Sequence, residues 1–225
     1  MKPIGHIHTL STRRNAIMAE FIKLYEENPQ EVKIRKIAQV LKNGGLIIYP
    51  TDTVYGIGCD LFNQRAIQRL CHLKGVKPDK LNFSFLCSDL SDLSLYAKAI
   101  PNNIFKLMKK VLPGPYTFIL HSNSRVPKIV NAKKKQVGIR VPNNNIIKML
   151  VQELGNPIIS SSIKDDDEVL EYQTDPELIF EKFEKLVDVV IDGGFGHNTA
   201  STVVDCTSDE PEVVRYGLGE IDSYI

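Results

Sequence analysis

The stretch Leu46-Ile47-Ile48-Tyr49-Pro50-Thr51-Asp52-Thr53-Val54-Tyr55-Gly56-Ile57-Gly58 decides the fold of this chain. Its apolar beginning predicts a short buried strand, which must end at Pro50 because proline cannot donate a hydrogen bond to a neighbouring strand. Hydroxyls, a carboxylate and two glycines follow, and glycine permits close approach of the backbone. A strand that leads into small polar groups is a common ligand site in α/β folds. The same residues also fit a tight turn between two strands, in which Thr and Asp bind local backbone groups.

Apolar periodicity along the rest of the chain predicts alternating helices and strands. Ile34, Ile37, Ala38 and Leu41 recur at helical spacing and Gly44-Gly45 ends their helix, while Met18-Ala19-Glu20 suits the start of an earlier one. A further helix is expected after its N-cap Asn63, with Ala66, Ile67 and Leu70 buried, and others at 104–112, 145–154 and 176–183. Strands are expected at 46–49, 83–87, 116–120, 137–141, 157–161, 187–191, 201–205 and 212–215. This mixture predicts an α/β or α+β fold around one large sheet.

The composition is that of an ordinary globular protein. Of the 225 residues, 43% are hydrophobic and 24% are charged. We expect a single domain at 18–225 after a polar, basic extension at 1–17, which lacks the apolar core of a secretory signal. No apolar run approaches the ~20 residues that span a bilayer, so a soluble protein without a membrane partner is expected. The four cysteines lack metal-binding spacing and predict buried free thiols in a reducing compartment, the cytoplasm.

Pro50-Thr51-Asp52-Thr53-Val54-Tyr55-Gly56 resembles the signature of the YrdC-like family, whose best-known members make threonylcarbamoyl-AMP for tRNA modification. Other segments resemble further motifs of that family in the same order: Lys74-Gly75, Pro113-Gly114-Pro115-Tyr116-Thr117, Val137-Gly138-Ile139-Arg140-Val141-Pro142, Ser201-Thr202-Val203-Val204-Asp205 and Arg215-x-Gly217. Asn82-Phe83-Ser84 and Gly193-Gly194 are closer to its YciO branch. The resemblance covers residues 46–217 and implies a twisted mixed sheet flanked by helices, with a basic cleft.

The resemblance implies an L-threonylcarbamoyladenylate synthase-like nucleotidyltransferase, which joins L-threonine, bicarbonate and ATP, with Mg accompanying ATP and no resident metal site. Such a reaction needs positioning and positive charge around a triphosphate. Lys74 and Arg140 are the implied catalytic residues. The implied substrate or nucleotide contacts are Thr51, Thr53, Tyr55, Lys77, Thr117, Ser160, Ser162, Lys164, Ser201, Thr202 and Arg215.

Each implied cation also has a purely structural interpretation. Lys74 suits the C-terminus of a helix, where the dipole favours a positive charge. Arg140 lies among apolar neighbours and could form an ion pair, with Asp192 or Asp205 as candidate partners. Arg215, beside a turn, could be an ordinary surface arginine.

Two departures from the family pattern leave open whether the synthase activity is retained. Val76 stands where the family has an arginine, with Lys77 one place later. Lysine offers a point charge where arginine offers a planar fork. Lys164 stands where the family has the asparagine of a Ser-x-Asn motif. The acids at 165–167 that follow could hold magnesium or form an acidic surface turn.

A basic segment motivates a rival function. Residues 98–140 contain no acid and carry Lys98, Lys106, Lys109, Lys110, Arg125, Lys128, Lys133, Lys134, Lys135 and Arg140. Such a segment can meet nucleotide phosphates or RNA. The alternative function is therefore a double-stranded RNA-binding or ribosome-associated protein without synthase activity. Solvated charges that happen to cluster would explain the same pattern.

Overall fold

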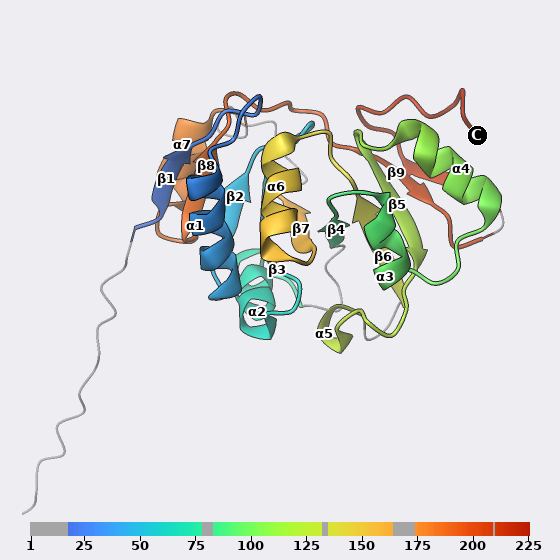
Figure 1. Ribbon diagram of the computed structural model, residues 1–225, viewed down its shortest axis with the longest axis horizontal. Coiled ribbons are helices and arrows are strands. Elements are labelled where there is room, and N and C mark those ends of the chain that lie inside the picture. Colours follow the sequence, from blue (N-terminus) through green and yellow to red (C-terminus); the bar gives the residue numbers. More distant parts are fainter. Residues whose placement is uncertain (1–17, 78–82, 132–134, 164–173, 209) are drawn as a thin grey trace, which may run out of the picture.

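The computed structural model describes residues 18–77, 83–131, 135–163, 174–208 and 210–225 (Figure 1). The expected extension at 1–17, Asn82, Lys133, Lys134, Lys164 and the acids at 165–167 lie outside these described residues.

A ten-stranded mixed sheet runs through the molecule in the order β1-β8-β2-β3-β7-β4-β6-β5-β9-β10. Its strands are β1 (Glu20–Lys23), β2 (Ile47–Tyr49), β3 (Gly56–Asp60), β4 (Ser84–Leu86), β5 (Tyr116–His121), β6 (Gln136–Arg140), β7 (Ile158–Ser162), β8 (Val189–Asp192), β9 (Thr202–Asp205) and β10 (Glu212–Arg215). Parallel pairs join β1 and β2 to β8, β4 to β6, and β5 to β9, while the other neighbours are antiparallel. The predicted α/β fold with a mixed sheet and flanking helices is confirmed.

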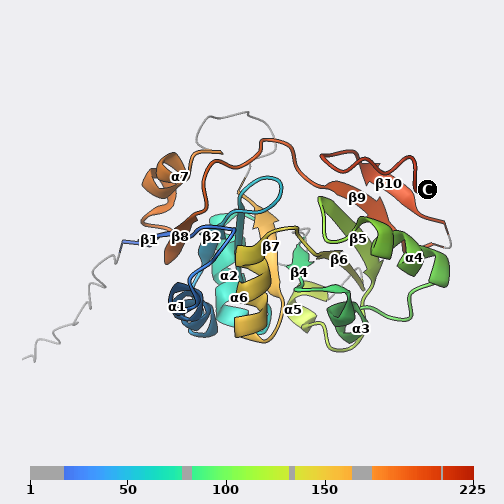
Figure 2. The same cartoon turned by 45° about the horizontal axis from the view of Figure 1, so that its top comes forward.

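Helices cover both faces of this sheet. They are α1 (Glu31–Lys42), α2 (Gln64–Leu73), α3 (Leu93–Tyr96), α4 (Asn102–Val111), α5 (Lys128–Asn131), α6 (Asn145–Leu154) and α7 (Pro176–Phe183), with a 3₁₀ turn, η1, at Leu90–Asp92. Figures 1 and 2 show α1 and α6 side by side in front of the sheet. Their apolar stripes pack with Ile47, Tyr49, Leu86 and Ile158 into one buried cluster.

The opposite face carries the larger core. Alternate residues of the central strands, including Ile57, Phe85 and Ile159, pack there with the buried sides of α2, α3, α4 and α7. Because side chains alternate across a strand, each central strand supplies residues to both faces. On the α1–α6 face, the neighbouring positions Gly58, Ser160, Ser84 and Gly138 carry no large apolar side chain.

Most expected elements are confirmed, with α6, α7 and β10 at the predicted residues. One is wrong: Met18-Ala19-Glu20 does not start a helix, because residues 20–23 form the edge strand β1, parallel to β8. Pairing with a neighbouring strand overrides local helix propensity there. All four cysteines are buried free thiols, as predicted. Within the described ranges, no helix is long and apolar enough to cross a membrane.

Candidate functional site

The loop at 50–55 joins β2 to β3 and is held by its own hydroxyls. Thr51 Oγ1 donates to the carbonyl of Val54 at 2.7 Å and accepts from the backbone N–H of Thr53 at 3.0 Å. The Thr53 side chain is fully buried. Threonine hydroxyls commonly stabilise turns in this way. The tight-turn and ligand-loop interpretations are therefore compatible, since the turn gives its polar groups fixed positions.

Arg140, at the end of β6, is bound by this loop. Its Nη2 donates to Thr53 Oγ1 at 2.7 Å and to Thr51 Oγ1 at 3.2 Å, and it forms an ion pair with Asp52. The candidate ion pairs with Asp192 and Asp205 are wrong, because the loop folds over the sheet and brings a nearer carboxylate to the guanidinium.

Asp52 connects two loops at this point. One carboxylate oxygen binds Arg140, and the other accepts the backbone N–H of Asn143 at 3.0 Å. Asn143 immediately precedes the N-cap of α6, Asn144. Asp52 was not among the predicted site residues, although its place between two hydroxyls in the signature was the available signal.

A row of small residues crosses four strands on one face of the sheet. Gly58 pairs with Ser160, Ser160 with Ser84, and Ser84 with Gly138. Directly paired residues point to the same side of a sheet. Ser84 and Gly138 are only half-buried. This small-residue row therefore forms a floor that a ligand can approach closely at Ser84 and Gly138, whereas Gly58 and Ser160 are buried beside Tyr49.

Lys74 lies at the end of β7, at Ser162, two residues beyond Ser160 of the small-residue row. It is the C-cap residue of α2, and its Nζ donates to the carbonyl of Ser162 at 3.2 Å. The next residue, Gly75, has a φ of +65°, a conformation that favours glycine. Val76 and Lys77, which follow, are both exposed. The structure thus brings Lys74 and Ser162 together and leaves Lys77 at the surface.

A third group joins β5, β9 and β10. Thr117 Oγ1 and Ser201 Oγ are hydrogen-bonded at 2.9 Å. Arg215 donates from Nε and Nη2 to the Ser201 carbonyl at 3.2 and 2.8 Å. Thr117 also borders the floor, since a Cβ placed on Gly138 would lie 3.4 Å from Thr117 Cγ2. These three predicted residues are therefore assembled at the other side of the floor.

Thr202 is placed differently from its neighbour Ser201. Its side chain is fully buried, and its hydroxyl donates to the carbonyl of Gly219 at 2.6 Å and accepts the N–H of Gly217 at 2.9 Å. In this structure the Thr202 hydroxyl ties the C-terminal segment to β9. A ligand contact at Thr202 stays a prediction.

Tyr55 links the 50–55 loop to the loop after β8. Its hydroxyl donates to the Gly194 carbonyl at 2.7 Å and accepts the N–H of Gly193 at 3.2 Å. A Cβ on Gly193 would lie 2.4 Å from Pro50 Cγ, so glycine permits this close approach. Burial is the main cause that raises the pKa of Tyr55. Its hydroxyl is therefore a neutral donor at physiological pH.

Ser160 is bonded on the same face of the sheet by Tyr49, whose hydroxyl donates to Ser160 Oγ at 2.6 Å. Burial raises the pKa of Tyr49, so this donor also keeps its proton. Tyr49 and Ser84 were missed as members of the site. The period-two alternation of β4 and β7 was the signal for Ser84, whereas nothing local to Tyr49 indicates its partner.

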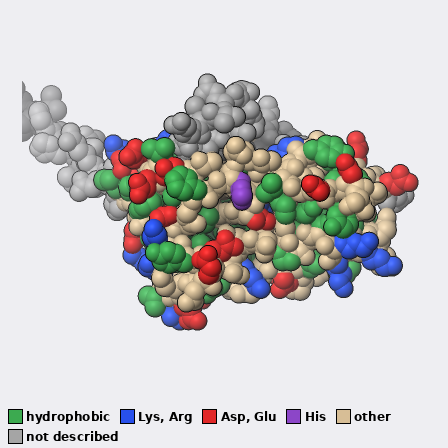
Figure 3. Space-filling view, turned by 90° about the horizontal axis from the view of Figure 1, so that it is seen from above, with side chains coloured by type: hydrophobic (Ala, Val, Ile, Leu, Met, Phe, Trp, Pro, Cys, Tyr) green, Lys and Arg blue, Asp and Glu red, His purple; other side chains and the backbone are tan. Residues whose placement is uncertain are grey.

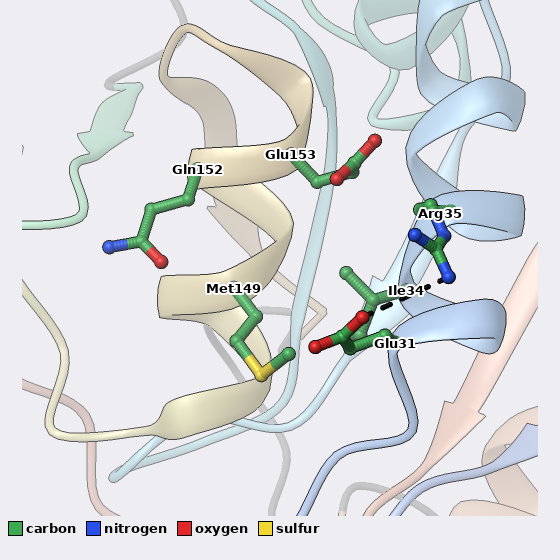
Figure 4. A pocket seen from close by; sticks show the side chains of 6 residues that line it. All are labelled: Glu31, Ile34, Arg35, Met149, Gln152 and Glu153. Carbon is green, nitrogen blue, oxygen red and sulfur yellow. Dashed lines mark ion pairs between the residues drawn. The ribbon is translucent and has the colours of Figure 1, made fainter.

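A shallow depression of about 310 Å³ between α1 and α6 contains none of the predicted site residues (Figure 4). It is lined by Glu31, Ile34, Arg35, Met149, Gln152 and Glu153. Arg35 is paired there with Glu31 at 3.8 Å. Exposed pairs of this kind contribute little, and we assign no role to the depression. Across the described part of the chain, no group of three or more His, Cys, Asp or Glu side chains is arranged to hold a metal ion.

Comparison with known proteins places the chain in a family. Residues 39–217 match the model of the Sua5, YciO and YrdC proteins, described as "Telomere recombination". YciO of Escherichia coli K12 is 39% identical over 210 residues, which cover 92% of this chain and all of YciO. The crystal structure of E. coli YciO superposes with a TM-score of 0.85, again over 92% of this chain and all of that one.

More distant relatives carry a functional name. A threonylcarbamoyl-AMP synthase of Pyrococcus abyssi is 30% identical over 203 residues, covering 88% of this chain but only 59% of the synthase. The crystal structure of P. abyssi Sua5 complexed with L-threonine has a TM-score of 0.82 and 30% identity, over 91% of this chain and 60% of that one. The extent of the sequence match and the shared architecture leave one assignment: the chain belongs to the Sua5/YciO/YrdC family.

Proposed function

We propose that the protein is a nucleotidyltransferase of the threonylcarbamoyl-AMP synthase type, which acts in tRNA threonylcarbamoyladenosine modification. The observation that carries this proposal is the similarity to P. abyssi Sua5, whose structure with L-threonine matches 91% of this chain. The substrates would be L-threonine, bicarbonate and ATP, and magnesium would arrive with ATP.

The proposed reaction has a defined electron flow. Bicarbonate gives carbon dioxide and hydroxide, and the threonine nitrogen bonds to the carbon and loses a proton, which leaves with the hydroxide as water. An oxygen of the resulting carbamate attacks the α-phosphorus of ATP. The bond from that phosphorus to the bridging oxygen breaks, and pyrophosphate leaves. Positioning and charge stabilisation suffice for such a transfer, without a covalent enzyme intermediate.

The residues around the small-residue row suit these demands. Lys74 supplies a positive charge next to the Ser162 end of β7, where a phosphate could lie. Ser84 and Gly138 leave the floor open to a ligand. On the far side, Thr117 and Ser201 offer hydroxyls that can act as donor or acceptor.

Val76 distinguishes this chain from relatives that have the family arginine at the same position. In place of the family arginine, an exposed valine follows Gly75. A hydrocarbon side chain cannot bind a carboxylate or phosphate. Lys74 therefore carries more of the electrostatic task here, and we expect a slower synthase than a member with that arginine.

The test is pyrophosphate release from ATP, with threonine and bicarbonate each omitted in turn. Release that needs all three substrates, and that falls at least about a hundredfold in Lys74→Ala, would support the synthase. A matched control is Lys33→Ala, because Lys33 also donates to a backbone carbonyl, that of Lys23 at 2.9 Å, but on α1. Absence of release in the wild type would exclude the proposal.

A second candidate, RNA binding, is favoured by α4. Lys106, Lys109 and Lys110 are exposed on this helix, and Lys109 Nζ lies 5.9 Å from the ring centroid of Phe105. Figure 3 shows basic side chains gathered toward the right-hand end, which α4 occupies in Figure 1. Binding of double-stranded RNA that weakens steeply with salt, and that is lost in K106A/K109A/K110A while pyrophosphate release persists, would support this candidate.

A further inference from the structure

The ion pair between Arg140 and Asp52 is nearly removed from solvent. The two side chains are only 9% and 11% exposed. Each charge therefore depends on the other, because a buried charge without its partner is costly. As the structure stands, the positive charge of Arg140 is already matched from within the chain.

The guanidinium is nevertheless incompletely bonded. Nη2 makes its contacts with Thr51, Asp52 and Thr53, so that one nitrogen serves three acceptors. The buried Nε has no hydrogen-bond partner in the described structure. Buried donors are nearly always paired, and an exception calls for an explanation such as a missing ligand. A bidentate oxyanion would satisfy an arginine better than this one-sided arrangement.

The surroundings of Asp52 make it an exchangeable partner. Its second oxygen is held by the Asn143 N–H at the surface. Glu26 lies close enough to add negative charge: burial chiefly raises the pKa of Glu26, and repulsion from Glu27 and Asp52 contributes. Repulsion between neighbouring carboxylates weakens the hold of Arg140 on Asp52.

Arg140 also stands where a ligand on the floor could reach it. It follows Gly138 by two residues on β6, so the Arg140 side chain extends from the face on which Gly138 leaves room. Opposite Arg140 on β4 is Leu86, at the edge of the apolar cluster under α6. Arg140 thus marks the boundary between the covered and open parts of this face.

We propose that Asp52 is a positioning residue that neutralises Arg140 in the ligand-free protein, and that a substrate oxyanion replaces it on binding. The oxyanion is either the carboxylate of the amino acid or a phosphate of the nucleotide. The exchange releases the 50–55 loop from Arg140 and couples its position to occupancy of the site. This proposal deepens the proposed function and rests on it only for the identity of the oxyanion.

The test is calorimetric binding of sodium pyrophosphate, ATP and L-threonine, each separately, to the wild type and to Asp52→Asn. Removal of the competing carboxylate should tighten binding of one of the oxyanions about tenfold. A gain for pyrophosphate and ATP would identify a phosphate, and a gain for L-threonine a carboxylate. Asp60→Asn is the matched control, because Asp60 accepts backbone and amide N–H groups without a cation partner among the described residues. Equal or weaker binding of all three ligands by folded D52N overturns the proposal.

A second measurement covers the case in which D52N does not fold. The Nε–H resonance of Arg140, assigned by its loss in Arg140→Lys, should move when the wild type is saturated with the bound oxyanion, because Nε gains an acceptor. An unchanged resonance at saturation overturns the proposal. A protein that shows the exchange but releases no pyrophosphate from ATP would keep this inference and lose the synthase function.

Discussion

Arg140 and Lys74 are the two cations implied as catalytic, and the structure gives them opposite surroundings. Arg140 is 7% exposed and held by Asp52 and two threonines of one loop. Lys74 is half-buried at the end of α2, beside a backbone carbonyl and an open glycine. In the ligand-free protein the positive charge is thus matched inside the chain at Arg140 and stands at the rim of the site at Lys74. Stability and activity measurements should separate these two roles.

The largest expected effect on stability is that of Arg140→Ala. The variant leaves Asp52 nearly buried and without its cation, so the free energy of unfolding should fall by about 3–5 kcal/mol. Urea denaturation measures this loss. In the double variant R140A/D52N, the loss should be smaller than the sum of the single losses, since the buried charge is gone. A loss below about 1 kcal/mol in R140A would equate the pair with a surface salt bridge.

Gly58→Ala and Gly75→Ala compare the buried surroundings of Gly58 with the open surroundings of Gly75, next to Lys74. A Cβ on Gly58 would lie 2.5 Å from the Ile159 carbonyl oxygen and 2.8 Å from the Tyr49 hydroxyl, both in the buried layer. We expect G58A to lower the free energy of unfolding by about 2–3 kcal/mol. Near Gly75, beside Lys74, no atom of the described residues beyond its chain neighbours lies within 4 Å of such a Cβ, so only the positive φ is strained, at about 1 kcal/mol. Equal losses in urea denaturation would contradict the contrast between a packed floor and an open rim.

Tyr49→Phe should have a still smaller effect. It removes the hydroxyl that donates to Ser160 Oγ at 2.6 Å. The free energy of unfolding should fall by about 1 kcal/mol, because the Ser160 acceptor stays buried. Thermal denaturation checks this value against Tyr25→Phe. Tyr25 is 54% exposed, so its substitution should change the free energy of unfolding by no more than about 0.5 kcal/mol. An equal change in the free energy of unfolding in both variants would mean that the hydrogen bond from Tyr49 to Ser160 does not stabilise the fold.

The sequence predicted those parts of the fold that local physics specifies. Asn63 caps α2 as predicted, since its side chain accepts a hydrogen bond from the N–H of Ala66, and Pro113 follows directly on the predicted stripe of α4. These signals lie within a few residues of the elements they define. The strand β1 was missed because its formation depends on β8, far along the chain.

The site was predictable as a set of residues but not as an arrangement. The family motifs indicated Arg140, Thr51 and Thr53, which the structure brings together. Their connection through Asp52, and the row that joins Ser84 to Ser160, depend on which strands are neighbours. Strand order is set by tertiary packing and was not readable from single segments.

The most direct test compares the two cations in one assay. Pyrophosphate release and urea denaturation should be measured on the same samples of wild type, Lys74→Ala and the control Lys33→Ala. We expect K74A to lose at least about a hundredfold in release, while its free energy of unfolding changes by no more than about 0.5 kcal/mol. Unchanged release in K74A, or a loss of activity explained by unfolding, would contradict the assignment of Lys74 as the ligand-facing cation.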